Sequence, residues 1–545
     1  MPKLTTAQAV VATLELNGID TLFCLPGVQN DSFFDALYDR TNAIRPIHAR
    51  HEQACAYMAL GSAMATGQPS AYAVVPGPGF LNTTAALSTA YAVNAPVLAL
   101  SGQIAQAMIG RNVGLLHELP DQLAIMRGLT QHAARIPAAA QAPAMVGDAF
   151  RRLRSGRRRP VALECAMDTW GRRADVVLPD AATPGDALPL DEDGVDRAVK
   201  LLGAAERPLI CVGGGAQHAG EALRILAEAL DAPVLAVRMG HGALDARHPL
   251  AVTAAAGHRF WAEADVVLAV GTRLQSQLMN WGADDSLKIV RVDIDSEELD
   301  RQRRPEIGIV GDSALVLAAL ADRIAAHNRT RTGRLAHVAS VKAAADAAFR
   351  DRLAPQIAYL DAIRAALPEN GILVDELTQM GYVARLAWPT YRPRTFLSPG
   401  YQGTLGWGFA TSLGVKVAKP DTPVVSINGD GGFLFTAMEL ATAAQHGIAA
   451  VAVVFSDGAF GNVRRIQKQS YAGRTIATEL RNPDFVKLAE SFGVEAHRVE
   501  GPAALGAAVS RALGRGVPVL IDCPVGELPD PWPSIALPRV RPSPR

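Results

Sequence analysis

Short apolar runs alternate with helix-length segments along almost the whole chain. The runs IDTLFCL, SAYAVVPG and APVLALSG lie near its start, and GILVDE, PVVSING and VAVVFSDG lie in its last third. Apolar runs of this length, separated by helices, are typical of parallel strands in sheets that helices cover on both faces. The sequence therefore predicts an α/β fold built from doubly wound parallel sheets.

The alternation breaks twice, and the breaks divide the 545 residues into three domains. A stretch rich in Pro, Asp and Gly at 168–193 is typical of a linker, and 320–354 is a polar helical connector. We expect doubly wound domains at residues 1–170, 190–325 and 355–530. The first and third echo each other weakly, because each contains a Gly-rich turn, a helix and a returning strand. The Pro-rich tail after them is expected to run extended over the surface.

The charge balance argues against a polyanionic partner. Lysine plus arginine and aspartate plus glutamate number 53 each, so nothing attracts nucleic acid or a membrane surface. The basic run RRLRSGRRRP has no interleaved aromatic residues and is interpreted as a solvated helix end. No run approaches the roughly 18 uncharged apolar residues of a membrane span, and the N-terminus has no charged leader before an apolar core. We therefore expect neither a nucleic-acid nor a membrane partner.

The cysteines argue against a disulfide framework and against a zinc site. They are odd in number, scattered and never arranged as CxxC. A reducing cytoplasm fits this pattern best, so a cytoplasmic location is expected. The five residues are Cys24, Cys55, Cys165, Cys211 and Cys523.

Two aspartates stand at the ends of successive predicted strands in the third domain. Gly429-Asp430-Gly431 follows VVSIN at a strand-to-helix turn, and Asp457 closes VAVVF one helix later. Both belong to the carboxyl edge of a parallel sheet, where open α/β sheets bind ligands. Two carboxylates repel each other unless a cation lies between them, and such oxygen ligands suit Mg²⁺. With glycines and a helix N-terminus beside it, the pattern predicts a metal and diphosphate site, although the bare tripeptide also fits a structural turn.

The segment from GDGGF to FSDGAFGNV resembles the motif with which thiamine-diphosphate-dependent enzymes hold Mg²⁺ and the cofactor diphosphate. Further segments are similar to acetolactate synthase and related 2-oxo-acid decarboxylases and carboligases. The family motif ends in Asn-Asn, whereas this chain has Ser456-Asp457. The aspartate adds a negative charge beside Asp430, which should sharpen the requirement for metal. The further segments are RHEQACAYMALGSAMATG, VPGPGFLN, GTLGWGFATSLGVK and RNPDFVKLAESFGVEAHRVEG.

The resemblance implies an architecture and an assembly. The first domain would bind the aminopyrimidine, and the third would bind the diphosphate. In this family the cofactor lies between the first domain of one subunit and the third domain of another. We therefore expect at least a homodimer, and more specifically a homotetramer. FAD is bound in the central domain of some relatives, but the altered segment GTRLQSQLMNWG disfavours it here.

The resemblance also assigns roles to single residues. Glu52 matches the glutamate that bonds aminopyrimidine N1′, and the apolar helix it begins would desolvate it so that it can carry a proton. An exposed glutamate favoured by the helix dipole is the alternative. Leu405 matches the apolar residue that bends the cofactor, with a core leucine as the alternative. The implied metal ligands are Asp430, Asp457 and the carbonyl of Ala459. The other implied cofactor contacts are Asn82, Gly403, Gly429, Gly431, Gly432, Phe460, Gly461 and Asn462.

The positions expected to face the substrate depart from acetolactate synthase. His117 stands where that enzyme has glutamine, Ile466 where it has the tryptophan that selects the second 2-oxo acid, and Gln277 where it has arginine. His117 could donate or take a proton, although a structural loop histidine is the alternative. Val28, Gln29 and His51 are further substrate candidates, with a plain loop or a packed histidine as the alternative.

The pattern as a whole predicts a thiamine-diphosphate- and Mg²⁺-dependent enzyme. It would decarboxylate a 2-oxo acid and then either protonate the product or pass it to an acceptor carbonyl. One alternative is a lyase or hydrolase that cleaves a C–C bond of a diketone or a 2-hydroxy ketone. Another is a non-catalytic protein that binds a nucleotide through Gly213-Gly214-Gly215. The sequence does not identify the physiological substrate.

Overall fold

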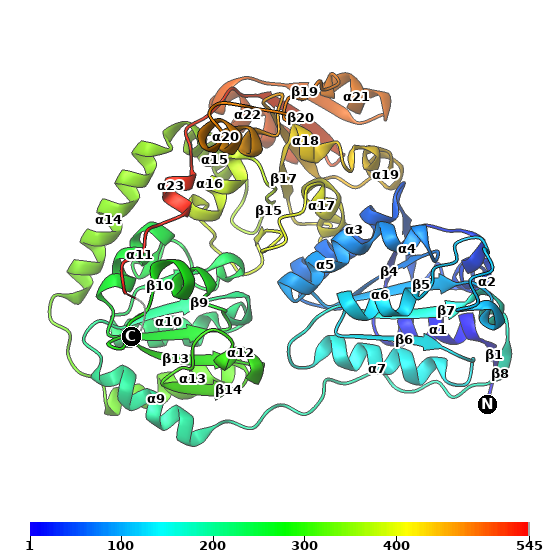
Figure 1. Cartoon of the computed structure of the whole chain (residues 1–545), viewed down its shortest axis with the longest axis horizontal. Coiled ribbons are helices and arrows are strands. Elements are labelled where there is room, and N and C mark those ends of the chain that lie inside the picture. Colours follow the sequence, from blue (N-terminus) through cyan, green and yellow to red (C-terminus); the bar gives the residue numbers. More distant parts are fainter. Residues whose placement is uncertain (543–545) are drawn as a thin grey trace.

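Three parallel sheets of six strands each follow one another along the chain in the computed structural model, which describes residues 1–542. Figure 1 shows them as separate lobes, with the first domain in blue and cyan, the central domain in green and the third in yellow to orange. Helices lie on the sheets as the alternating pattern predicts, so the prediction of three doubly wound α/β domains is confirmed. The exact domain boundaries stay predictions.

The first and third sheets have the same topology. In each, the second of the six strands in chain order forms one edge, the first lies next to it, and the third and fourth are central neighbours. The first sheet has the order β3 (Arg45–His48), β2 (Thr21–Cys24), β4 (Ser70–Val74), β5 (Val97–Gln103), β7 (Val161–Ala166) and β6 (His132–Ile136). The third has the order β16 (Phe396–Leu397), β15 (Ile372–Val374), β17 (Val424–Gly429), β18 (Val451–Ser456), β20 (Val519–Pro524) and β19 (Glu495–Arg498). The weak echo in the sequence therefore reflects two equivalent sheets.

The central sheet is wound differently and has the strand order of dinucleotide-binding folds. Its strands run in the order β11 (Ala251–Val252), β10 (Val234–Ala236), β9 (Leu209–Val212), β12 (Val266–Val270), β13 (Lys288–Asp293) and β14 (Ile307–Val310). Strand order reverses between β9 and β12. A further antiparallel pair, β1 (Lys3–Thr5) and β8 (Arg173–Asp175), joins the two ends of the first domain.

The helices fill the intervals between the strands. In the first domain they are α1 (Thr6–Leu16), α2 (Asp31–Tyr38), α3 (Glu52–Thr66), α4 (Pro78–Asn82), α5 (Thr84–Val93), α6 (Gln122–Leu129), α7 (Ala142–Arg154) and α8 (Met167–Trp170). The central domain has α9 (Glu192–Ala204), α10 (Gly220–Leu230), α11 (Ala254–Glu263), α12 (Ser296–Asp300) and α13 (Ser313–Arg323), and α14 (Arg334–Arg352) leads on from it. The third domain has α15 (Ala354–Ala366), α16 (Gln379–Ala387), α17 (Trp407–Ala418), α18 (Asp430–Phe433), α19 (Leu440–His446), α20 (Gly461–Ser470), α21 (Phe485–Ser491), α22 (Gly501–Leu513) and α23 (Trp532–Ile535). None of the helices within residues 1–542 combines the length and apolar character that a membrane crossing requires.

Helices α3 and α17 join the first domain to the third within one chain (Figure 1). They cross so closely that a Cβ on Gly414 would lie 1.9 Å from the carbonyl oxygen of Met58. A Cβ on Gly61 would lie 2.2 Å from the carbonyl oxygen of Thr411. Only glycine fits such an approach of two backbones, so these residues fix how the two domains pack.

The C-terminal tail corrects the expectation of an extended surface segment. It contains the short helix α23 and then returns to the central domain, where Arg541 is 5% exposed. The Arg541 guanidinium donates to the carbonyl oxygens of Trp261 and Ala264 and pairs with Asp284 at 3.0 Å. Proline content alone could not predict this, because the partners of the tail lie far away in the sequence.

Candidate active site

Asp430 lies at the carboxyl edge of the third sheet, where β17 ends and α18 begins. Its side chain is buried, and Oδ2 accepts hydrogen bonds from the N–H groups of Asp457 at 3.2 Å and Gly458 at 2.7 Å. The amide nitrogen of Asn482 donates to the same oxygen at 2.7 Å. The structure therefore brings the two predicted acidic residues together, and Asp430 also organises the backbone that carries Asp457.

Asp457 is partly buried and is held in place by neutral donors. Its Oδ1 accepts from the N–H of Ala459 at 3.1 Å, and Oδ2 accepts from Nε2 of Gln379 at 2.7 Å. Burial, followed by the negative charge of Asp430, raises the pKa of Asp457. A cation between the carboxylates would relieve this repulsion, so the donor chemistry fits Mg²⁺. No group of three or more His, Cys, Asp or Glu side chains within residues 1–542 forms a metal site, so further ligands would be backbone or cofactor oxygens.

The glycines around these aspartates are required by the packing of the protein itself. A Cβ on Gly431 would lie 2.6 Å from the Phe460 ring, and one on Gly432 would lie 2.6 Å from Oε1 of Glu376. A Cβ on Gly461 would lie 2.7 Å from Oδ2 of Asp457. Neighbouring side chains therefore already exclude a larger residue at these three positions, and a contact of these glycines with a ligand stays a prediction. Gly429 differs from these three glycines, because a Cβ on it would lie 3.6 Å from Cβ of Thr378, which is an ordinary contact distance.

The GTLGWG loop lies beside this turn and presents Leu405. Gly403 and Gly406 have φ values of +58° and +80°, which lie in the left-handed region that favours glycine. The N–H of Gly406 donates to Oε1 of Glu376 at 2.5 Å, and Nε1 of Trp407 donates to the carbonyl oxygen of Asp375 at 2.5 Å. Leu405 itself is partly exposed, which argues against the alternative of an ordinary core leucine.

In the first domain, Glu52 and Asn82 are joined directly. Oε2 of Glu52, the first residue of α3, accepts a hydrogen bond from Nδ2 of Asn82 at 3.0 Å. Nδ1 of His51 accepts from the N–H of Gln53 at 3.2 Å, so His51 caps the helix, a role that the sequence had not suggested. Glu52 is partly exposed, so one chain alone does not provide the full desolvation that we expected.

His117 and Gln29 form a second pair in the first domain. Nε2 of Gln29 donates to the carbonyl oxygen of Leu116 at 3.3 Å, which leaves its Oε1 as the acceptor that faces Nδ1 of His117 at 3.1 Å. Nδ1 must therefore carry the proton, and Nε2 is the acceptor nitrogen of the neutral ring. His117 has a φ of +69°, and the neighbouring Val28 is 57% exposed.

The turn VPGPG brings the two pairs of the first domain together. A Cβ on Gly79 would lie 3.5 Å from Oε1 of Glu52, and one on Gly77 would lie 2.5 Å from the carbonyl oxygen of His117. Glu52 and His117 thus lie at the same turn although they are far apart in the sequence.

The first-domain and third-domain groups are not joined within one chain. Among residues 1–542, no hydrogen bond or ion pair links Glu52, Asn82, Gln29 or His117 to the Asp430 and Asp457 pair. The polar links between the two domains lie elsewhere, as in the N–H of His51 donating to Glu439 at 3.1 Å. Ile466, on α20, is 41% exposed.

The Gly-Gly-Gly turn of the central domain, Gly213–Gly215, packs against backbone of the neighbouring strand end. A Cβ on Gly213 would lie 2.3 Å from the carbonyl oxygen of Gly271, and one on Gly215 would lie 2.7 Å from the Gly271 Cα. The Gly-Gly-Gly turn is therefore closed by protein backbone, which favours its interpretation as a tight structural turn. The five cysteines are buried free thiols and take no part in any site described above.

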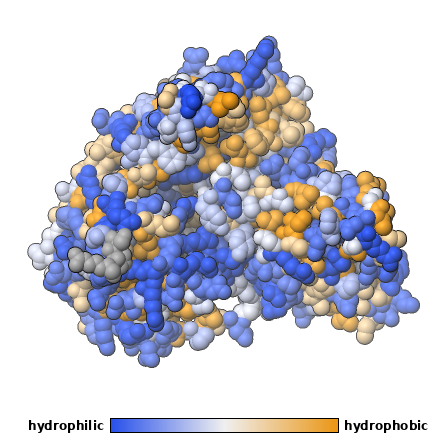
Figure 2. Space-filling model, in the orientation of Figure 1, coloured by the Kyte–Doolittle hydropathy of each residue, from blue (hydrophilic) through white to orange (hydrophobic). Residues whose placement is uncertain are grey.

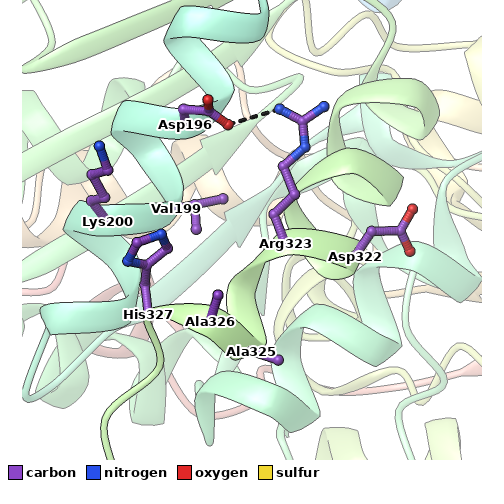
Figure 3. A pocket seen from close by; sticks show the side chains of 8 residues that line it. All are labelled: Asp196, Val199, Lys200, Asp322, Arg323, Ala325, Ala326 and His327. Carbon is purple, nitrogen blue, oxygen red and sulfur yellow. Dashed lines mark hydrogen bonds and ion pairs between the residues drawn. The ribbon is translucent and has the colours of Figure 1, made fainter.

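Two cavities lie outside the predicted site. Figure 3 shows one of about 620 Å³ on the central domain, where Arg323 pairs with Asp196 beside Lys200 and His327. Its charged side chains lie at the solvent-facing end of α9 and α13, and it contains none of the predicted residues. A cavity of about 220 Å³ lies between the central and third domains, beside Trp388.

Sequence reasoning missed the residues that support the aspartates. Gln379 bonds Asp457, Thr378 packs against Gly429, Asn482 bonds Asp430, and Glu376 lies between the GTLGWG loop and Gly432. One signal was available: DELTQ follows the strand GILV and ends at the same carboxyl edge as the GDG turn. Asn482 lies in the segment RNPDFVKLAESFGVEAHRVEG, which carried the resemblance without assigning this residue a role.

Comparisons with known proteins agree with this arrangement. Residues 4–125 match the model described as thiamine pyrophosphate enzyme, N-terminal TPP binding domain. Residues 195–320 match the central domain of that family, and residues 377–523 match its C-terminal TPP binding domain.

Individual relatives extend over almost the whole chain. The probable 2-ketoarginine decarboxylase AruI of Pseudomonas aeruginosa is 34% identical over 498 residues, which cover 90% of this chain and 88% of that protein. A probable acetolactate synthase large subunit of Methanocaldococcus jannaschii is 33% identical, with 99% of this chain and 94% of the relative covered. Acetolactate synthase isozyme 1 large subunit of Escherichia coli is 29% identical over 95% of this chain and 93% of its own length. The chain belongs to the thiamine pyrophosphate enzyme family.

Proposed function

We propose that this protein is a thiamine-diphosphate- and Mg²⁺-dependent decarboxylase of a 2-oxo acid. The observation that carries the proposal is the buried Asp430 beside Asp457 at a sheet edge, with the GTLGWG loop next to it. Membership in the thiamine pyrophosphate enzyme family and the names of the relatives, 2-ketoarginine decarboxylase and acetolactate synthase, support the same chemistry.

Each group has a separate task in the proposed reaction. Asp430, Asp457 and the carbonyl of Ala459 would hold Mg²⁺, and the metal would hold the cofactor diphosphate. Thiamine diphosphate, when bound, supplies a nucleophilic C2 that adds to the carbonyl carbon of the 2-oxo acid. Glu52 would exchange a proton with the aminopyrimidine, and Leu405 would keep the cofactor in its bent form.

His117 would then handle the proton of the product. Its Nδ1 is engaged by Gln29, so its Nε2 is the nitrogen free to exchange a proton with the substrate. Because this position and Ile466 both depart from acetolactate synthase, we propose protonation, rather than transfer to a second 2-oxo acid, as the main outcome after loss of CO₂. A guanidinium-bearing 2-oxo acid is the first substrate to test, since one relative is named for it.

The active unit would be at least a dimer. The resemblance to thiamine-diphosphate-dependent enzymes implies a cofactor between the first domain of one subunit and the third domain of another, so we propose that the Glu52 group and the Asp430 group of one site come from two chains. Figure 2 shows apolar surface gathered over the first and third domains, while the central domain is mostly hydrophilic in this view. Exposed apolar side chains of the first and third domains include Val28, Leu116, Phe435 and Met438, and we propose that a second chain covers such side chains.

The test is a panel of 2-oxo acids and 2-hydroxy ketones with analysis of all products. We expect CO₂ release that requires both thiamine diphosphate and Mg²⁺, with an aldehyde as the main product. Acetolactate as the main product from pyruvate would instead indicate carboligation. Cleavage of a diketone or a 2-hydroxy ketone without CO₂ would overturn decarboxylation. Sedimentation of the cofactor-loaded protein as a monomer would overturn the shared site.

A further inference from the structure

Two buried oxygen atoms in the third domain lack hydrogen-bond partners and face the same glycine. Oε2 of Glu376 and Oδ1 of Asn428 are both enclosed and unpaired. A Cβ on Gly408 would lie 3.2 Å from the Glu376 oxygen and 2.6 Å from the Asn428 oxygen. The two atoms therefore border one small space. Two unpaired acceptors in a protein interior are unfavourable, so the pair needs an explanation.

The orientation of the Asn428 amide cannot supply the missing donor. Its Nδ2 donates to the carbonyl oxygen of Val453 and to Oγ of Ser426, both at 3.1 Å. Turning the amide over would place Oδ1 against the Val453 carbonyl, which is only an acceptor. Asn428 therefore presents an acceptor to Glu376. One proton on Oε2 of Glu376 would satisfy both oxygens at once.

The surroundings of Glu376 favour that proton. The side chain is fully buried, and burial, followed by the charge of Asp375, raises its pKa to about 8 despite the Gly406 hydrogen bond. Asp375 is itself paired with Arg385 at 2.6 Å, and the hydroxyl of Tyr57 on α3 is the other titratable group nearby. No lysine, arginine or histidine within residues 1–542 bonds Glu376, so its charge has no direct partner.

We propose that Glu376 is a neutral acid that positions the cofactor-binding loop. Its Oε2–H donates to Oδ1 of Asn428, while its Oε1 accepts the N–H of Gly406 and packs against Gly432. The side chain thereby ties the GTLGWG loop to the GDG turn and sets where Leu405 stands. The contacts of Glu376 given above are all to protein groups, and we therefore assign it as a positioning residue. Its protonated state is independent of the proposed reaction, whereas its effect on the cofactor rests on the proposed function.

The protonated state is tested on the cofactor-free protein with Glu376→Gln. Glutamine keeps both bonds, because its amide donates to Asn428 and its oxygen accepts from Gly406. A carboxyl with a raised native pKa stabilises the fold at low pH, and that contribution is lost as pH rises toward about 8. Wild type should thus lose stability relative to E376Q, by up to about tenfold in the folding constant per pH unit. The matched control is Glu490→Gln on the exposed face of α21, which should not alter the pH profile.

Denaturant midpoints measured between about pH 5 and pH 9 give these profiles. Difference infrared spectra of wild type against E376Q supply a second readout, in which a protonated carboxyl band should be present at neutral pH and fade above about pH 8. Parallel stability profiles, together with a carboxylate band at neutral pH, would overturn the proposal.

The positioning role is tested by binding of thiamine diphosphate in the presence of Mg²⁺. Wild-type affinity should weaken above about pH 8, E376Q should bind equally well across the range, and Glu376→Ala should weaken binding about tenfold or more at every pH. If E376Q binds as poorly as E376A, the neutral-acid role is wrong. If wild type binds no thiamine diphosphate, the proposed function fails while the stability result still stands on its own.

Discussion

The Gly-rich turns of the first and third domains occupy the same place in two sheets of the same strand order. Each follows the third strand of its domain and leads to the fourth, as β4 leads to β5 and β17 leads to β18. The third-domain turn gathers Asp430 and Asp457 under backbone N–H donors. The first-domain turn instead lies against Glu52 and His117. One topology thus offers two edges with different chemistry, one suited to a cation and a diphosphate and the other to proton transfer.

The difference between the two turns predicts that substitutions in them have different effects on cofactor binding and turnover. Changes at the third-domain turn should remove binding of the cofactor. Changes at the first-domain turn should leave binding and remove turnover. The four substitutions below run from the largest expected effect to the smallest.

Asp430→Ala should abolish binding of thiamine diphosphate with Mg²⁺. It removes a metal ligand and also leaves the N–H groups of Asp457 and Gly458 without their acceptor. Calorimetric titration of the cofactor at fixed Mg²⁺ measures this. Asp430→Asn is the control, because it keeps an acceptor oxygen for the backbone and separates folding from metal binding. Cofactor binding by D430A at wild-type strength would show that the metal site lies elsewhere.

Glu52→Gln should bind the cofactor but reduce kcat by about 10³-fold, within the usual range for removal of a general acid or base. The glutamine can still bond Asn82, so the local structure should persist. Steady-state turnover and cofactor affinity, measured on the same preparation, show whether kcat falls while cofactor binding is retained. Unchanged turnover of every substrate that wild type accepts would remove Glu52 from the proposed chemistry.

His117→Gln restores the residue that acetolactate synthase has at this place. We expect about a 10²-fold slower formation of the protonated product, because the acceptor nitrogen Nε2 is lost. The share of carboligated product should rise, since the decarboxylated intermediate then survives longer. Product ratios by mass analysis test this. An unchanged pH profile and an unchanged ratio would favour the structural interpretation of His117.

Asp457→Asn should have the smallest effect and keep turnover within about threefold of wild type, because either side chain can ligate Mg²⁺ through oxygen. The substitution removes the repulsion by which Asp430 raises the pKa of Asp457. The metal-free protein should therefore become more stable near neutral pH, and because Mg²⁺ no longer relieves this repulsion, D457N should need more Mg²⁺ for half-maximal activity. A lower Mg²⁺ requirement in D457N would contradict this reasoning, and a melting curve without metal supplies the second readout.

Much of this arrangement was open to sequence reasoning, because its signals are local. A run such as VVSIN followed by GDG predicts a strand, a turn and the start of a helix within a few residues. The strand order of a parallel sheet then brings Asp457, at the end of the next strand, close to Asp430. The supporting residues were not predictable in this way. Gln379 and Asn482 bond the aspartates from segments in which sequence reasoning gave these two residues no role, and the tail that carries Arg541 binds to another domain.

The sequence by itself determined the alternation of strands and helices, the three-domain division and the position of the acidic turn, since apolar periodicity and glycine placement act over short distances. Only the tertiary structure decided which side chains pack against the glycines and which groups surround Glu376. Gly431, Gly432 and Gly461 face protein side chains, and Glu376 meets an acceptor that leaves room for one proton. Both features depend on groups from distant segments of the sequence that pack together in the fold. Their packing limits the space beside each glycine, and burial favours the uncharged form of a carboxyl such as that of Glu376.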